Sequence, residues 1–277
     1  MPKSLSKALF LGALSSVLCL YSFAQKLPAD QEVSVLAPNN VKIDGRAGEW
    51  NNQLQAHNRS TDIDYTIAND KANLYIVIQS KDAVIAKKIL AGGITVRINA
   101  GGKKDNKKVA VGYQMVASSA KSKLGMLIAE QATATEENTK KKQTDSIISV
   151  LNTVMNASIK EIKVTGISAI TDSLISIYNT TGIKVGSLFD KQRNLTCELA
   201  IPLKYLDFLT ADNSKLNYQI VLNGLEAAET VYLKNPTPSG VISVTSIPRS
   251  MSGGANSSIT QIINFSTDFW GEYTLAK

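Results

Sequence analysis

Short segments in which apolar and polar residues alternate run through most of this chain, and this alternation constrains its fold most strongly. In 62–68 (DIDYTIA), Ile63, Tyr65 and Ile67 fall on one face of an extended strand. The segment 74–79 (LYIVIQ) is apolar enough for the centre of a sheet. The short polar link between the two segments predicts a turn and therefore an antiparallel hairpin. The period of two predicts a mainly β protein.

Further short strands follow the same pattern, and turn-forming residues separate them. They are predicted at 32–36, 40–43, 94–99, 108–116, 161–167, 173–178, 183–188, 194–201, 216–224 and 231–234. Many short strands with frequent turns favour a single antiparallel β-sandwich over 25–277. At 235–258, three prolines and a segment rich in Ser and Gly predict a long mobile loop.

The segment 120–158 differs from the rest and predicts a helical insertion in the sandwich. Thr144 is a candidate N-cap for a helix that runs through Ala157. The apolar residues of that helix fall on one stripe: Ile147, Ile148, Leu151, Val154 and Met155. Two interpretations are open, a helix packed over one end of the sandwich and a lid or partner-binding arm.

The first 24 residues have the three parts of a signal peptide. Lys3 and Lys7 are basic, 8–21 is apolar, and 22–24 (SFA) supplies small residues at a cleavage site. An apolar run of this length is shorter than the ~20 residues that span a bilayer as a helix. We therefore expect a mature chain that begins at Gln25, has no stable membrane span and is periplasmic, displayed on the cell surface or secreted.

Removal of this leader changes the cysteine count and the charge. Cys19 suggests a lipoprotein alternative, but Leu18 stands where a lipobox needs a small residue. After cleavage Cys197 is the sole cysteine, which predicts a buried structural thiol and no internal disulfide. The formal charge of +7 loses Lys3 and Lys7 and becomes +5. The remaining lysine runs are not interleaved with aromatic residues, which argues against a nucleic-acid partner.

Four segments carry a resemblance to a known family. They are 41–50 (VKIDGRAGEW), 65–70 (YTIAND), 73–78 (NLYIVI) and 195–206 (LTCELAIPLKYL). In this order they resemble the IDG-x-x-x-E-W entry, the strand pair and the E-x-x-IP element of family 9 carbohydrate-binding modules and their DOMON-like relatives. The resemblance implies a β-sandwich of immunoglobulin-like or jelly-roll-like architecture and a possible role in carbohydrate binding.

The first of these motifs also has a physical interpretation. Asp44 and Gly45 suit a tight turn, because Asp bonds its own backbone and Gly accepts positive φ. Trp50 can bury ~150–250 Å² and close one end of a sandwich. Glu49 is positioned to cap or pair nearby. We interpret these four residues as structural.

The candidate ligand site lies away from this motif. Aromatic residues make up only 6% of the chain, and there are two tryptophans. With Trp50 structural, Trp270 is the remaining strong platform for a sugar ring. The candidate binding residues are Trp270, Glu272, Tyr273 and Arg97. A core role for the terminal strand at 269–273 is the alternative.

Catalytic and metal sites are not indicated. His57 is the single histidine, so neither a Ser-His-Asp triad nor a multi-histidine zinc site is evident. No spacing supports haem ligation by His57 with Met115 or Met155. Asp62, Asp64 and Glu198 are candidate acids for glycoside hydrolysis, and Asp62, Asp64 and Asp70 for calcium, but no motif selects either set.

These observations predict an exported, non-catalytic binding module without cofactor or metal. Its expected partner is a carbohydrate or glycan. The alternative is a structural or protein-interaction component of the bacterial cell envelope with no small-molecule ligand.

Overall fold

The fold is that of a computed structural model. It describes residues 26–100, 109–113, 116, 118–209, 214–225 and 257–277, with only the helical backbone at 118–119 and 257–260. The predicted leader at 1–24, the predicted strand at 231–234 and most of the predicted loop at 235–258 lie outside the described residues.

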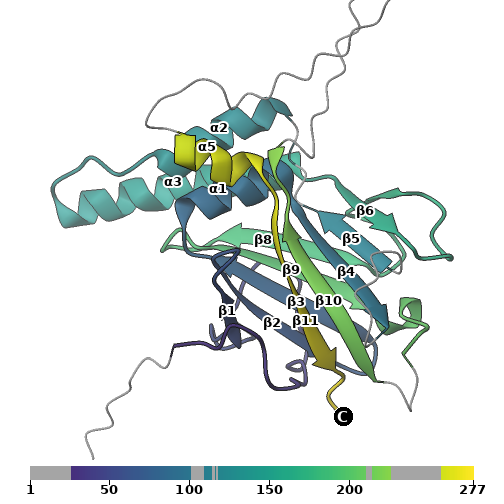
Figure 1. Cartoon of the computed structure of the whole chain (residues 1–277). Helices are drawn as coiled ribbons and strands as arrows, with labels where there is room; N and C mark the ends of the chain where they lie inside the picture. Colours follow the sequence, from purple (N-terminus) through teal and green to yellow (C-terminus); the bar gives the residue numbers. More distant parts are fainter. Residues whose placement is uncertain (1–25, 101–108, 114–115, 117, 210–213, 226–256) are drawn as a thin grey trace, which may run out of the picture.

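Two antiparallel sheets face each other and form a sandwich (Figure 1). Sheet A contains, in spatial order, β1 (Ala56–Asn58), β2 (Ile63–Asn69), β3 (Asn73–Ser80), β9 (Leu195–Pro202) and β8 (Lys184–Phe189). Sheet B contains β11 (Thr267–Thr274), β10 (Lys215–Leu222), β4 (Ile94–Ala100), β5 (Val109–Tyr113), β6 (Glu161–Thr165) and β7 (Leu174–Ser176). The pairs β2–β3 and β4–β5 are antiparallel, as predicted. The mainly β class is therefore confirmed.

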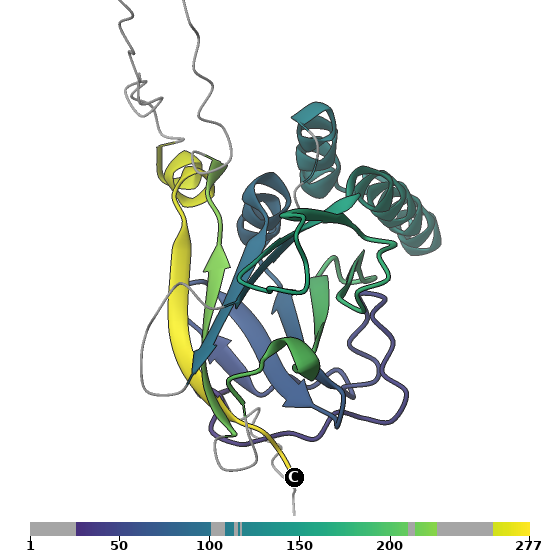
Figure 2. The same cartoon turned by 90° about the vertical axis from the view of Figure 1, so that its right-hand side faces the viewer.

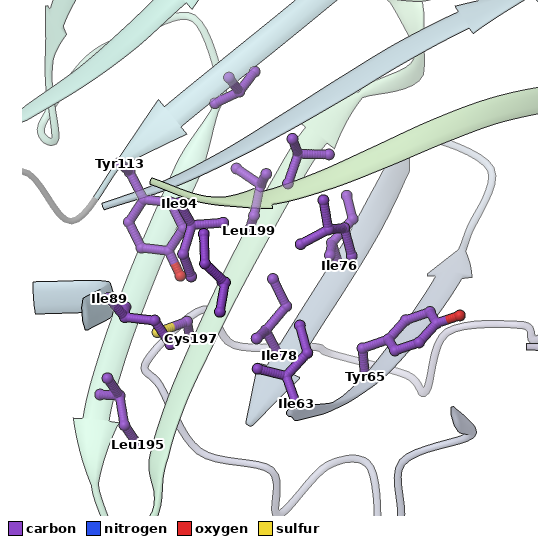
Figure 3. Packing of buried hydrophobic residues seen from close by; sticks show 14 of the residues in the cluster. Ile63, Tyr65, Ile76, Ile78, Ile89, Ile94, Tyr113, Leu195, Cys197 and Leu199 are labelled. Atoms are coloured by element: carbon purple, nitrogen blue, oxygen red, sulfur yellow. The ribbon is translucent and has the colours of Figure 1, made fainter. Parts of the chain in front are cut away.

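The core lies between the inner faces of the two sheets (Figure 3). Ile63, Ile76 and Ile78 come from sheet A, and Ile94 and Tyr113 come from sheet B; all are almost fully buried. They occupy alternate positions of their strands, which is why the period of two in the sequence predicted the sheets. Burial of each such side chain contributes about 1.5–3 kcal/mol.

Helices gather at one end of the sandwich (Figure 2). They are α1 (Ala83–Gly92), α2 (Ser118–Ala129), α3 (Glu137–Ser158) and α5 (Ser257–Asn264), with a 3₁₀ turn η1 (Leu203–Tyr205) elsewhere. The helix α1 was not predicted from the sequence. The Asp82 carboxylate accepts hydrogen bonds from the first turn of α1, and Gly93 ends it with φ of 80°. No helix in the described part of the chain is both long and apolar enough to cross a bilayer.

The helix predicted from Thr144 begins earlier, at Glu137. Glu136 caps it by accepting from the backbone of the first turn, whereas the Thr144 hydroxyl donates to the Lys140 carbonyl within the helix. The exposed lysines at 140–142 are good helix formers, so they extend the helix ahead of its apolar stripe. The stripe itself packs inward: Ile148, Leu151 and Met155 are buried. The structure thus places α3 over the end of the sandwich.

The strands predicted at 32–36 and 40–43 are wrong. This segment crosses the outer face of sheet A instead, and Val35 and Val41 pack on it beside Trp50. Its one ladder contact is an isolated bridge between Leu36 and Asn69. The apolar alternation there reflects packing on the face of a sheet rather than pairing within one.

Candidate functional site

The outer face of sheet B carries two rows of polar and aromatic side chains. Strand register places Trp270, Gln219 and Arg97 opposite one another across β11, β10 and β4. Glu272 and Asn217 are opposite each other in the next row. Directly opposed residues share a face of a sheet, and residues two apart on a strand share it too. Both rows therefore point away from the core.

Three of the four predicted binding residues are brought together on this outer face: Arg97, Trp270 and Glu272. The fourth, Tyr273, lies on the opposite side of β11 and is only 3% exposed. Its hydroxyl donates to Asn69 Oδ1 at 2.8 Å, which fixes the end of sheet B to sheet A. The core interpretation of the terminal strand thus holds for Tyr273, while Trp270 is partly exposed.

A chain of hydrogen bonds orders the side chains beside Trp270. Arg97 Nη1 donates to Gln219 Oε1 at 2.9 Å, and Gln219 Nε2 donates to Asp268 Oδ2 at 2.5 Å. In the next row, Lys215 Nζ lies 2.7 Å from Glu272 Oε2. These contacts hold flexible side chains in place without a ligand, which lowers the entropic cost of binding one.

The pocket at this edge of sheet B has a volume of about 500 Å³. Small-ligand sites usually have volumes of ~300–1,000 Å³. It opens where the free edge of β11 meets the N-terminal segment. Its lining residues are Asp30, Gln31, Asn217, Trp270, Gly271 and Glu272. The pocket therefore combines one large aromatic side chain with amide and carboxylate groups.

Asn217 is the least satisfied of these polar residues. It is 5% exposed, and its Oδ1 accepts no hydrogen bond within the described part of the chain. A buried amide oxygen without a donor costs about 1–3 kcal/mol. The side chain amides of Gln31, by contrast, bond the backbone of Val33 and Ile67, so Gln31 serves the fold.

Two tyrosines lie behind the pocket. The hydroxyls of Tyr65 and Tyr218 are 3.0 Å apart, and a side chain at Gly271 would collide with Tyr218, because an added Cβ would lie 2.2 Å from its oxygen. Burial is the main cause that raises the pKa of both tyrosines, and the negative charge of Asp30 raises both further. Both tyrosines therefore stay neutral. The negative charge of Asp30 acts on the groups that lie behind the pocket.

Sequence reasoning missed Asp30, Asn217, Gln219 and Asp268 as neighbours of Trp270. Part of the signal was present, because Asn217 and Gln219 are the polar positions of an alternating strand. The position of Asp30 depends on how the N-terminal segment passes the edge of β11, for which the sequence offers no periodic pattern.

The motif residues of the first family-like segment form a clasp on the outer face of sheet A. The Glu198 carboxylate accepts from the backbone N–H groups of Asp44 and Gly45, at 2.9 and 2.8 Å, and from Trp50 Nε1 at 3.0 Å. Gly45 has φ of 82°. Glu49 makes no hydrogen bond or ion pair with any described residue. Burial raises the pKa of Glu198, and its three donors act in the opposite direction.

His57 lies in a separate cleft of about 360 Å³ on the outer face of sheet A. Its Nδ1 is 2.7 Å from Asp64 Oδ1 and its Nε2 is 3.6 Å from Asp62 Oδ1, while Lys81 Nζ is 2.6 Å from Asp64 Oδ2. Both ring nitrogens thus face carboxylates. No described cluster of His, Cys, Asp or Glu could hold a metal ion.

The other candidate metal and haem ligands lie apart from His57. Asp70 stabilises the β2–β3 turn by accepting from the backbone of Ala72 and Asn73, so it does not join Asp62 and Asp64. Met155 is fully buried on α3, and Met115 lies outside the described residues. Cys197 is a buried thiol in the core near Tyr113 (Figure 3).

Comparison with known proteins adds no family to this description. No protein-family model matches the chain, and no curated protein matches it either.

Proposed function

We propose that this chain is an exported, non-catalytic binding module of DOMON-like fold that holds a carbohydrate at the Trp270 pocket. The observation that carries the proposal is the pairing of Trp270 with the buried, unsatisfied Asn217 in one pocket. The CH face of a sugar ring packs on an aromatic ring, and its hydroxyls supply the donors that the Asn217 oxygen lacks.

Other features of the pocket agree with this chemistry. Glu272 and Asp30 add carboxylate acceptors for further hydroxyls, and the Arg97–Gln219–Asp268 chain keeps the adjoining surface ordered. The resemblance of 41–50 and 195–206 to family 9 carbohydrate-binding modules points to the same class of ligand. The two resembling motifs meet at the Glu198 clasp, which supports the proposed fold.

Titration calorimetry with a panel of neutral and charged oligosaccharides tests the proposal. Trp270→Ala should weaken binding of the selected glycan at least tenfold, equivalent to ~1.4 kcal/mol. Tyr178→Ala is the matched control, because Tyr178 is an exposed aromatic beside β7, at the other edge of sheet B. Glycan binding that survives Trp270→Ala would reject this site.

A structural or protein-interaction role in the envelope is the second candidate. It is supported by Met126 on α2 and Val150 on α3, which are 67% and 43% exposed. Because the buried stripe of α3 belongs to the core, removal of the helices would disturb the fold. Met126→Glu with Val150→Glu is the better test: loss of complex formation in cross-linked envelope preparations supports this role, and unchanged complexes oppose it.

A further inference from the structure

The charged groups of the Trp270 pocket are anions rather than cations. None of its lining residues is basic; they include the carboxylates of Asp30 and Glu272 and the amide oxygen of Asn217. Two basic residues of the same face are engaged by other side chains, since Arg97 donates to Gln219 and Lys215 pairs with Glu272. A ligand that fits this pocket must bring donors and tolerates, or prefers, positive charge.

Asp30 is the carboxylate best placed to meet such a charge. It is exposed, and it has no hydrogen bond or ion pair with any described residue. Its negative charge reaches the pocket floor, where it raises the pKa of the buried Tyr65 and Tyr218 beyond the effect of burial. Glu272 differs, because Lys215 already neutralises much of its charge.

Asn217 is an independent observation that points to a donor on the ligand. Its amide oxygen is buried and lacks a donor within the described chain, whereas the Gln219 amide in the neighbouring row is bonded at both ends. An ammonium group carries three N–H donors and a positive charge. Once the Asn217 side-chain amide turns its oxygen toward the pocket, the ammonium group can satisfy that oxygen while it faces the carboxylate of Asp30.

We infer that the ligand class of this pocket is an amine-bearing sugar, in which a protonated amino group faces Asp30 and Asn217 and the ring packs on Trp270. The inference rests on the proposed carbohydrate-binding function and narrows it. Trp270 can make two kinds of interaction with such a ligand. Its ring face packs on the sugar ring and also attracts a nearby cation.

The experiment is titration calorimetry of the exported chain at pH 5.5 with chitosan tetramer, which is made of glucosamine. The comparison ligands are the fully N-acetylated tetramer of the same length, a neutral glucose tetramer, a uronic-acid tetramer and spermine, a linear polyamine without a sugar ring. We expect the glucosamine tetramer to bind at least tenfold more tightly than each of the other four.

Two variants test the proposed contacts. Asp30→Asn should reduce the preference for glucosamine over its acetylated form at least fivefold and should weaken binding of the neutral tetramer by about twofold at most. Asp172→Asn removes one exposed carboxylate near the opposite edge of sheet B and should change neither quantity.

The outcomes separate the inference from the function on which it rests. Equal affinity for glucosamine, acetylated and neutral tetramers would overturn the amine preference while the carbohydrate function stands. Tightest binding of the uronic-acid tetramer, or equal binding of spermine, would also overturn it. Failure of every sugar to bind would contradict the proposed function itself.

Discussion

The outer faces of the two sheets differ in how far the chain covers them and satisfies their polar groups. On sheet A, the N-terminal segment covers the face, Trp50 is buried, and all the donors around Glu198 find an acceptor. On sheet B, Trp270 is partly exposed and the buried oxygen of Asn217 lacks a donor in the described chain. Both faces thus place a tryptophan beside a polar acceptor. Where the chain itself supplies the donors, as at Glu198, the pair stabilises the fold; where it does not, as at Asn217, the pair suits a ligand.

Removal of the Glu198 carboxylate should give the largest effect. Glu198→Ala leaves the N–H groups of Asp44, Gly45 and Trp50 without their buried acceptor, so we expect a loss of about 3–5 kcal/mol in unfolding free energy. Urea denaturation measures it. Glu272→Ala is the control on the other sheet, since Glu272 is exposed; equal losses in the two variants would remove the contrast between the faces.

Lys88 of α1 extends the comparison to a buried cation at the helical end of the molecule. It is fully buried and donates to Thr267 Oγ1 at 2.8 Å, and burial lowers the pKa of its ammonium to about 8. Between pH 8 and 10.5 the unfolded chain binds a proton that the folded chain has released, so stability should rise with pH by up to ~3 kcal/mol. Below pH 8 the buried ammonium is protonated, and the full free-energy cost of its burial is present.

Lys88→Met should therefore stabilise the protein at pH 7, by about 1–3 kcal/mol after allowance for lost packing, and should remove the rise between pH 8 and 10.5. Thermal or urea unfolding across this pH range provides the measurement. Lys87→Met, on the same helix and more exposed, is the control. A wild-type curve that is flat between pH 8 and 10.5 would contradict the prediction.

Asn217→Leu should separate binding from stability on sheet B. Because the variant removes an unsatisfied buried oxygen, we expect unfolding free energy to stay within about 1 kcal/mol of wild type or to increase. Glycan affinity should fall at least tenfold by calorimetry. A large loss of stability would mean that Asn217 stabilises the fold, and its unsatisfied oxygen would then no longer support a ligand site.

Tyr273→Phe should give the smallest effect. It removes one hydroxyl that bonds Asn69, so about 0.5–1.5 kcal/mol of stability should be lost, with glycan affinity unchanged because Tyr273 faces the core. Urea denaturation and calorimetry on the same preparation test both parts. Reduced affinity at unchanged stability would move Tyr273 back into the binding site.

Most strands were predictable because their packing follows a local period. Ile63, Tyr65 and Ile67 point to the core as the alternation required. The segment 32–43 has similar alternation but meets a strand only at the bridge between Leu36 and Asn69. Its apolar side chains pack on a sheet face instead, and this arrangement depends on tertiary structure. The helix α1 was missed because its sequence has no clear polar face. Most of its residues, including Lys88, are buried.

The candidate site was predictable in part. Residue type alone pointed to Trp270, Glu272 and Arg97. Tyr273 was grouped with them although residues three apart on a strand face opposite sides, so strand periodicity already separated it from Trp270. Asp30 could not be predicted as a neighbour, because only the path of the N-terminal segment brings it to β11.

Tryptophan fluorescence during a glycan titration tests the central claim most directly, since the chain has two tryptophans in contrasting environments. Trp270 lies in the proposed pocket and Trp50 is buried in the clasp. We predict a saturable change in emission for wild type, with the midpoint found by calorimetry, and no change for Trp270→Phe. An emission change that persists in Trp270→Phe, or glycan binding by calorimetry with no emission change in wild type, would contradict the account.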